Sequence, residues 1–188
     1  MALDGKCCYF TFGRFNPPTN GHKENFAAVK KAAGSNDYRI YISQKVTKNG
    51  TDPLPPDLKF HYMKLMFPEH RGKIFSGPTG ATPIMQELML AGYDEIVYMV
   101  GSDQVNSFSW LEKRNGIDWS FRKFEIRSSG KRDPDGKTFS ISGTKMRLAV
   151  VDNDFDKFRA GIPKTLNDRD CRKLFDDLKV RIPKDYKG

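Results

Sequence analysis

The sequence has only three cysteines among its 188 residues, and two of them, Cys7 and Cys8, are adjacent. This spacing gives neither a disulfide framework nor a set of metal ligands, and such low cysteine usage is typical of a reducing cytoplasm. No run of eighteen or more apolar residues is present, so we expect no membrane span. The first eight residues lack the apolar core of a secretory signal. We therefore expect a cytoplasmic protein.

Internal repeats, low-complexity tracts and blocks of like charge are also missing. The net charge is nevertheless +9, which suits an anionic partner such as a nucleotide, pyrophosphate or nucleic acid. Because the charge is spread along the chain, a solvated lysine-rich surface accounts for much of it. A nucleic-acid-binding protein would show a continuous basic stripe with exposed aromatic rings, and no segment shows one. Nucleic acid is thus a partner that the sequence allows but does not indicate.

The sequence does contain an alternation of strand-like and helix-like segments. Apolar, β-branched and aromatic runs predict strands at residues 9–12, 38–43, 73–75, 94–100 and 124–127. Periodic apolar positions and capping residues predict helices at 21–33, 57–67 and 82–91, after residue 142, and at 154–160 and 168–179. This order, with no helix between the last two strands, predicts an α/β fold: a Rossmann-like parallel sheet with helices on both faces and a helical C-terminal extension.

The most informative segment is residues 9–22, Tyr-Phe-Thr-Phe-Gly-Arg-Phe-Asn-Pro-Pro-Thr-Asn-Gly-His. Gly13 ends a buried strand, and the two prolines after Asn16 force a turn. Thr19 or Asn20 can cap the next helix, which places His22 on its first turn. Free backbone N–H groups and the helix dipole make that position electropositive, so an anion can bind there. The alternative is a purely structural strand–turn–helix in which His22 is an ordinary helix-start residue.

Residues 13–22 closely resemble the first signature of the HxGH nucleotidyltransferase superfamily. Thr19 stands where that signature has its first histidine, as in the nicotinamide mononucleotide adenylyltransferase branch. Residues 12–19 also resemble phage-encoded nucleotidyltransferases, which would place the protein in a host cytoplasm. The segment at 139–147, Phe-Ser-Ile-Ser-Gly-Thr-Lys-Met-Arg, resembles the second signature of the superfamily, Ile-Ser-x-Thr-x-x-Arg. Gly143 departs from the usual Ser or Ala, which predicts a looser helix start.

The resemblance implies transfer of an adenylyl group from ATP, or another nucleotidyl group from its triphosphate, to a phosphate-bearing acceptor such as a mononucleotide, with release of pyrophosphate. It implies a nucleotidyltransferase domain over residues 1–163 and an extension over 164–188. Mg²⁺ would accompany the triphosphate, because no carboxylate cluster is visible. The implied catalytic residues are His22, Arg147 and Lys45. The implied nucleotide- and phosphate-binding residues are Phe12, Gly13, Arg14, Phe15, Thr19, Lys48, Gly101, Asp103, Arg127, Ser142 and Thr144, and the implied acceptor-binding residue is Trp110.

Several of these roles have structural alternatives. Lys45 and Lys48 follow the carboxyl end of a predicted strand, where ligands bind in open α/β sheets, but they also fit a solvated loop. Asp103 can hydrogen-bond sugar hydroxyls or cap a helix, and Trp110 fits a packed surface position as well as a ring-stacking one.

Other functional classes remain as alternatives. Arg127-Ser-Ser-Gly130 is separated from the second signature, whereas cytidylyltransferases join the two, so ATP is favoured over CTP. The alternatives are a cytidylyltransferase and a phage-associated structural protein that binds a nucleotide or nucleic acid at a vestigial site. The sequence leaves the acceptor and any homo-oligomer undefined, and it has no Gly-x-Gly-x-x-Gly dinucleotide fingerprint.

Overall fold

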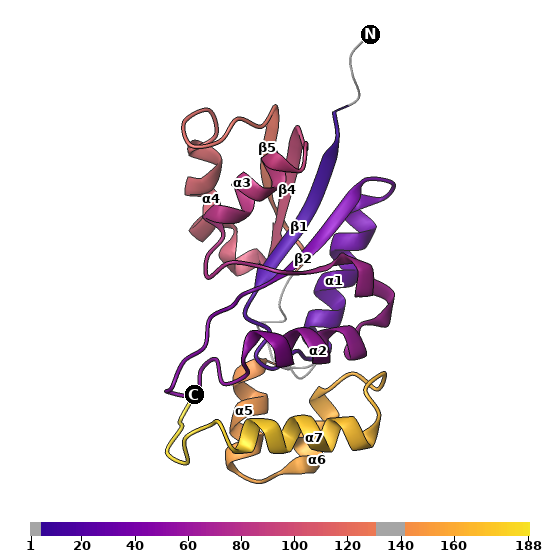
Figure 1. Ribbon diagram of the computed structural model, residues 1–188, viewed down its shortest axis with the longest axis vertical. Coiled ribbons are helices and arrows are strands. Elements are labelled where there is room, and N and C mark those ends of the chain that lie inside the picture. Colours follow the sequence, from indigo (N-terminus) through magenta and orange to yellow (C-terminus); the bar gives the residue numbers. More distant parts are fainter. Residues whose placement is uncertain (1–4, 131–141) are drawn as a thin grey trace.

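The computed structural model describes residues 5–130 and 142–188 (Figure 1). Its sheet has five strands in the order β3-β2-β1-β4-β5, and every neighbouring pair is parallel. The strands are β1 (Cys7–Gly13), β2 (Asp37–Ile42), β3 (Ile74–Ser76), β4 (Glu95–Val100) and β5 (Lys123–Ser128). All carboxyl ends of parallel strands lie at one edge, and the order reverses between β1 and β4. That reversal is where open α/β sheets bind their ligands.

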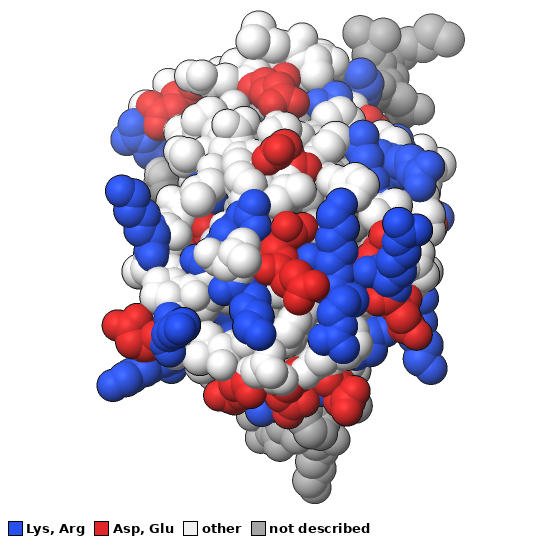
Figure 2. All heavy atoms as spheres, turned by 60° about the horizontal axis from the view of Figure 1, so that its bottom comes forward, with Lys and Arg blue, Asp and Glu red and all other residues white. Residues whose placement is uncertain are grey.

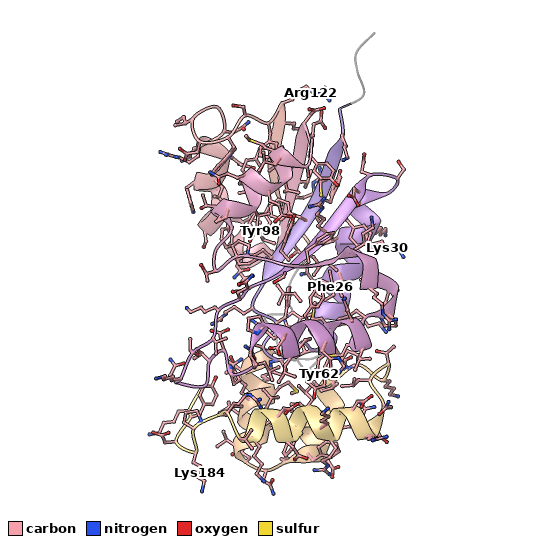
Figure 3. All side chains as sticks on the ribbon, viewed as in Figure 1. Phe26, Lys30, Tyr62, Tyr98, Arg122 and Lys184 are labelled. Carbon is pink, nitrogen blue, oxygen red and sulfur yellow. The ribbon has the colours of Figure 1, made fainter. Side chains whose placement is uncertain are left out.

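Helices cover both faces of the sheet, as the sequence predicts. Helices α1 (Asn20–Ala33) and α2 (Pro56–Met66) pack on one face, and α3 (Thr82–Leu90) and α4 (Val105–Lys113) pack on the other. Phe26 of α1 is fully buried on the first side, whereas Tyr98 of β4 stacks on Phe10 at 4.5 Å on the second (Figure 3). The short 3₁₀ helices are η1 (Pro68–Lys73) and η2 (Ser102–Gln104). The predicted Rossmann-like α/β fold is therefore confirmed.

Helix α4 between β4 and β5 is absent from the order predicted from the sequence. Adjacent parallel strands need a crossover connection, and α4 supplies it. The helix is short and carries Asn106, Ser107 and Ser109, with Leu111 its single fully buried residue. Val105 and Phe108 pack against the same core, so apolar residues recur at every third position, but this pattern extends over only nine residues.

The last three helices, α5 (Gly143–Val151), α6 (Phe155–Gly161) and α7 (Asp168–Lys179), lie together beyond the carboxyl ends of the strands, next to α2 (Figure 1). Their apolar side chains join the core that lies under α1 and α2. Tyr62 of α2 points toward α7 and donates to Asp177 Oδ2 at 2.7 Å (Figure 3). Thr165 Oγ1 donates to the Met66 carbonyl. The domain boundary at residue 163 stays a prediction.

Within the described ranges, no helix is long and apolar enough to cross a lipid bilayer.

Candidate functional site

The connection from β1 to α1 is a compact loop folded back on the strand that it leaves. A Cβ atom at Gly13 would lie 2.6 Å from Cζ of Phe15, so only glycine leaves room for that ring. Phe15 is buried, has a φ of +44° and is followed by a cis peptide bond between Asn16 and Pro17. Its ring meets the His22 ring edge-on at 4.9 Å. The loop thus presses Phe15 against the histidine and limits where that ring can go.

Thr19 is the N-cap of α1 and fixes the orientation of His22. The backbone N–H of Thr19 donates to His22 Nδ1 at 3.0 Å, and the His22 N–H donates to the Thr19 carbonyl at 3.0 Å. His22 therefore occupies the helix position where Glu or Gln usually accepts from the cap. Because an amide N–H can only donate, Nδ1 must be unprotonated, and the neutral ring carries its proton on Nε2. The first turn of α1 contains no acidic residue, so nothing there opposes an anion.

Arg147 of α5 joins the two signature segments. Its Nη1 donates to the Asn16 carbonyl at 2.6 Å, and its Nη2 donates to Thr144 Oγ1 at 3.0 Å. The residue is 6% exposed, and within the described ranges no carboxylate forms an ion pair with it. A buried cation without an anionic partner is costly. Bound phosphate oxygens would supply the missing negative charge.

Gly143 allows the start of α5 to approach the β1–α1 loop. A Cβ atom there would lie 3.1 Å from Arg147 Nη1 and 3.3 Å from the Asn16 carbonyl oxygen. Ser142 caps the helix by accepting from the Lys145 N–H at 3.2 Å. The glycine that departs from the family pattern thus gives the two segments room to meet, and the cap that the sequence predicts is present. Residues 139–141 of the second signature lie outside the described residues.

Tyr186 is a site residue that the sequence does not indicate. Arg147 Nε donates to its hydroxyl at 2.7 Å, and the tyrosine is 8% exposed. A Cβ atom at Gly50 would lie 3.1 Å from Tyr186 Cδ2, so the ring packs against the loop that follows β2. In Figure 1 the C-terminal segment ends beside that loop. No local pattern marks this tyrosine, because its partners are remote in the sequence.

The loop after β2 is anchored by Lys59, which the sequence also does not single out. The Lys59 ammonium of α2 donates to the carbonyls of Arg14, Ser43 and Lys45. Lys45 and Lys48 are exposed on this loop. The Arg14 side chain lies 3.5 Å from the buried Asp52 carboxylate.

The carboxyl end of β4 contributes Gly101 and Asp103. Asp103 is exposed within η2, and Gln104, not Asp103, is the residue before α4. Trp110 is 49% exposed in the middle of α4. The exposed indole ring could stack on a ligand ring, but α4 packs on the face of the sheet opposite α1. The structure does not bring Trp110 into contact with His22 or Arg147.

Two predicted nucleotide-binding residues lie away from the contacts between the two signatures. Phe12 packs with the core on the α3–α4 side of the sheet. Arg127 of β5 donates to both carboxylate oxygens of Glu125, at 2.8 and 2.9 Å. Arg127 also lines a shallow hollow between α1 and the end of β5. The other residues of this hollow are Ala28, Lys31, Ala32, Met99, Ser128, Ser129 and Gly130.

The donor set of the site suits phosphate oxygens. Backbone N–H groups, His22 Nε2–H and the Thr144 hydroxyl can each donate a hydrogen bond, and Arg147 adds a positive charge. Within residues 5–130 and 142–188, no three His, Cys, Asp or Glu side chains are grouped as metal ligands. A Mg²⁺ ion bound here would take phosphate oxygens and water as its ligands.

No protein-family model matches the chain, and no curated protein matches its sequence. Among solved structures, a Vibrio parahaemolyticus protein described as a nicotinate-nucleotide adenylyltransferase aligns with 90% of this chain and 98% of its own, at 12% identity and a TM-score of 0.57. The nicotinic acid mononucleotide adenylyltransferase of Plasmodium falciparum aligns with 91% of this chain and 98% of its own at 19% identity. Its TM-score is 0.54 in the complex with NaAD and 0.52 in the complex with APC. The chain shares the fold of these proteins.

Proposed function

We propose that the protein is a nucleotidyltransferase that transfers an adenylyl group from ATP to a phosphate-bearing acceptor and releases pyrophosphate. The observation that carries this proposal is the 2.6 Å hydrogen bond from Arg147 to the Asn16 carbonyl. It joins two helix N-termini, each free of acidic residues in its first turn, around one buried cation. Such an arrangement can bind several adjacent negative charges, such as those of a triphosphate.

His22 and Arg147 have different roles in this proposal. His22 Nε2 donates to an oxygen of the α-phosphate as negative charge builds there. The guanidinium of Arg147 has five N–H groups. Within residues 5–130 and 142–188, three of them donate to protein groups, which leaves two for the β- and γ-phosphates of the leaving group. Lys45 or Lys48 approaches the same phosphates from the loop after β2. No covalent enzyme intermediate is needed, because positioning and charge stabilisation carry phosphoryl transfer.

The acceptor is proposed to be a mononucleotide. The Plasmodium falciparum neighbour is a nicotinic acid mononucleotide adenylyltransferase solved in complex with NaAD, and its fold is shared over most of both chains. Trp110, Gly101 and Asp103 are the residues proposed to meet the acceptor and the sugar. Mg²⁺ would be carried by the triphosphate and would neutralise part of its charge. The cytoplasmic location and any homo-oligomer stay predictions.

Nucleic-acid binding has less support from the described surface. The face formed around the C-terminal helices carries Lys and Arg side chains interspersed with Asp and Glu (Figure 2). A nucleic-acid surface would instead show a continuous basic stripe with exposed aromatic rings.

The proposal is tested by mixing the protein with Mg·ATP or Mg·CTP and a panel of phosphate acceptors, including nicotinamide and nicotinate mononucleotides. We expect pyrophosphate release with ATP that depends on the acceptor, and mass spectrometry should find an adenylylated product in equal amount. A clear preference for CTP would overturn the choice of base. Absence of pyrophosphate with every pair would count against the enzymatic role as a whole.

A further inference from the structure

Lys59 is a lysine with no exposed surface, although lysine is rarely fully buried. Lys59 belongs to α2, and its side chain extends so that the ammonium reaches the carboxyl ends of two strands. Nζ donates to the Arg14 carbonyl at 3.2 Å, the Lys45 carbonyl at 3.4 Å and the Ser43 carbonyl. Arg14 directly follows β1, and Ser43 directly follows β2. One side chain therefore holds two loops that emerge next to each other from the sheet.

The three carbonyls match the three donors of an ammonium group, and a neutral amine would have only two. The charged groups facing Nζ are the buried Asp52 carboxylate, which favours the ammonium form, and the Arg14 guanidinium, which opposes it. Asp52 is itself paired with Arg14 at 3.5 Å, so the three side chains form one cluster. Through Lys59 the cluster contacts the Gly13–Phe15 turn, at the Arg14 carbonyl, and the loop that bears Lys45 and Lys48, at the Lys45 carbonyl.

We infer that Lys59 is a positioning residue for the triphosphate site, whose ammonium sets the distance between the turn that presses Phe15 on His22 and the lysine loop. This inference rests on the proposed function. Among the residues that the structure describes, the Lys59 ammonium donates only to backbone carbonyls, so Lys59 acts through the groups that would touch phosphate. When the ammonium loses its charge, one of its three N–H donors is lost. One of the three carbonyls then has no donor, and the two loops can separate.

The charge on Lys59 is sensitive to pH close to neutrality. Burial lowers the pKa of its ammonium to about 8, with Asp52 acting against the shift and Arg14 adding to it. A purely structural lysine would affect folding alone. A positioning lysine also affects the affinity for the triphosphate, and it does so in a pH-dependent way.

The test compares wild type with Lys59→Met, which keeps a long apolar chain without donors, and with Lys59→Arg, which keeps its charge at alkaline pH. Lys64→Met is the matched control, because Lys64 lies on the same helix and its ammonium covers the Phe60 ring instead. Steady-state kinetics with Mg·ATP and the acceptor that supports pyrophosphate release are measured from pH 7 to 9.5, and folding of each variant is checked by circular dichroism. If Lys59→Met does not fold, wild type and Lys59→Arg decide the matter.

We expect kcat/KM of wild type and Lys64→Met to fall at least fivefold above about pH 8. Lys59→Met should show a KM for ATP at least tenfold higher at pH 7.5 and no such fall, and Lys59→Arg should move the fall to higher pH. A flat wild-type profile, or a folded Lys59→Met with wild-type KM and the same alkaline fall, would overturn the inference while the proposed function stands. If wild type and Lys64→Met neither bind nor use any triphosphate, the proposed function fails and this inference fails with it.

Discussion

The backbone N–H of Thr19 donates a hydrogen bond to Nδ1 of His22 across 3.0 Å. This bond fixes the tautomer of the ring, because the acceptor nitrogen cannot carry a proton, and it leaves Nε2–H as the donor. Phe15 and Phe26 flank the ring and restrict its rotation. His22 is thus a pre-oriented hydrogen-bond donor at the N-terminus of a helix, the type of group that stabilises charge developing on an oxyanion.

Replacing His22 tests that role. His22→Ala should lower kcat about a hundredfold or more, the usual cost of losing one transition-state donor, with little change in KM for ATP. His61→Ala is the control, since His61 is exposed on α2 and should leave both constants unchanged. Full turnover by a folded His22→Ala would make His22 a helix-start residue only.

Arg147 should behave differently, because it would contact the leaving phosphates in the ground state as well. Arg147→Lys keeps the charge but cannot reproduce the planar fork that binds Asn16, Thr144 and Tyr186 together. We expect KM for ATP to rise about tenfold or more, and inhibition by pyrophosphate to weaken in parallel. Arg172→Lys, on α7 with its guanidinium over Phe155, is the control. An unchanged KM in Arg147→Lys would remove Arg147 from the phosphate site.

Tyr186 links the C-terminal segment to the site through one hydroxyl. Tyr186→Phe keeps the ring against Gly50 and removes the acceptor for Arg147 Nε. A hydrogen bond to a charged group contributes about 1.5–3 kcal/mol, so the free energy of unfolding in urea should fall by that order. KM for ATP should rise as the guanidinium loses its orientation. Tyr62→Phe, which breaks a bond to Asp177, should cost stability without altering KM, and equal KM effects in both variants would contradict this account.

The stability of the fold should also depend on pH through Lys59. Its pKa is about 8 in the folded protein, against 10.5 for an unperturbed lysine. Between these values the unfolded chain binds more protons than the folded one, so the free energy of unfolding rises with pH. The destabilising contribution is complete below pH 8 and disappears above 10.5. The free energy of unfolding of wild type minus that of Lys59→Met, measured by urea titration, should therefore increase from pH 8 to 10. If this difference stays constant with pH, the ammonium lies in a solvated environment.

Much of the fold could be predicted from the sequence, because strong local signals mark it. The apolar runs of β1 and β4, the Thr19 and Ser142 caps and the periodic apolar face of α7 each act over a few residues. Helix α4 is harder to predict, because its apolar residues Val105, Phe108 and Leu111 recur over only nine residues and stand among polar ones.

Less of the candidate site could be predicted from the sequence. His22 and Arg147 stand in signature segments, but their joining through the Asn16 carbonyl depends on packing between residues far apart in the chain. Lys59 and Tyr186 carry no motif at all. Each becomes visible only when the partner atoms, two loop carbonyl groups or a guanidinium, are placed beside it by the fold.

The most direct test of the central claim is a crystal structure of the protein with Mg²⁺ and a non-hydrolysable ATP analogue. We expect the phosphates to lie between the first turns of α1 and α5, with His22 Nε2 within hydrogen-bond distance of an α-phosphate oxygen and Arg147 donating to the β- or γ-phosphate. Phosphates bound elsewhere, for example at the exposed lysines of α1, with His22 and Arg147 contacting only protein, would contradict it.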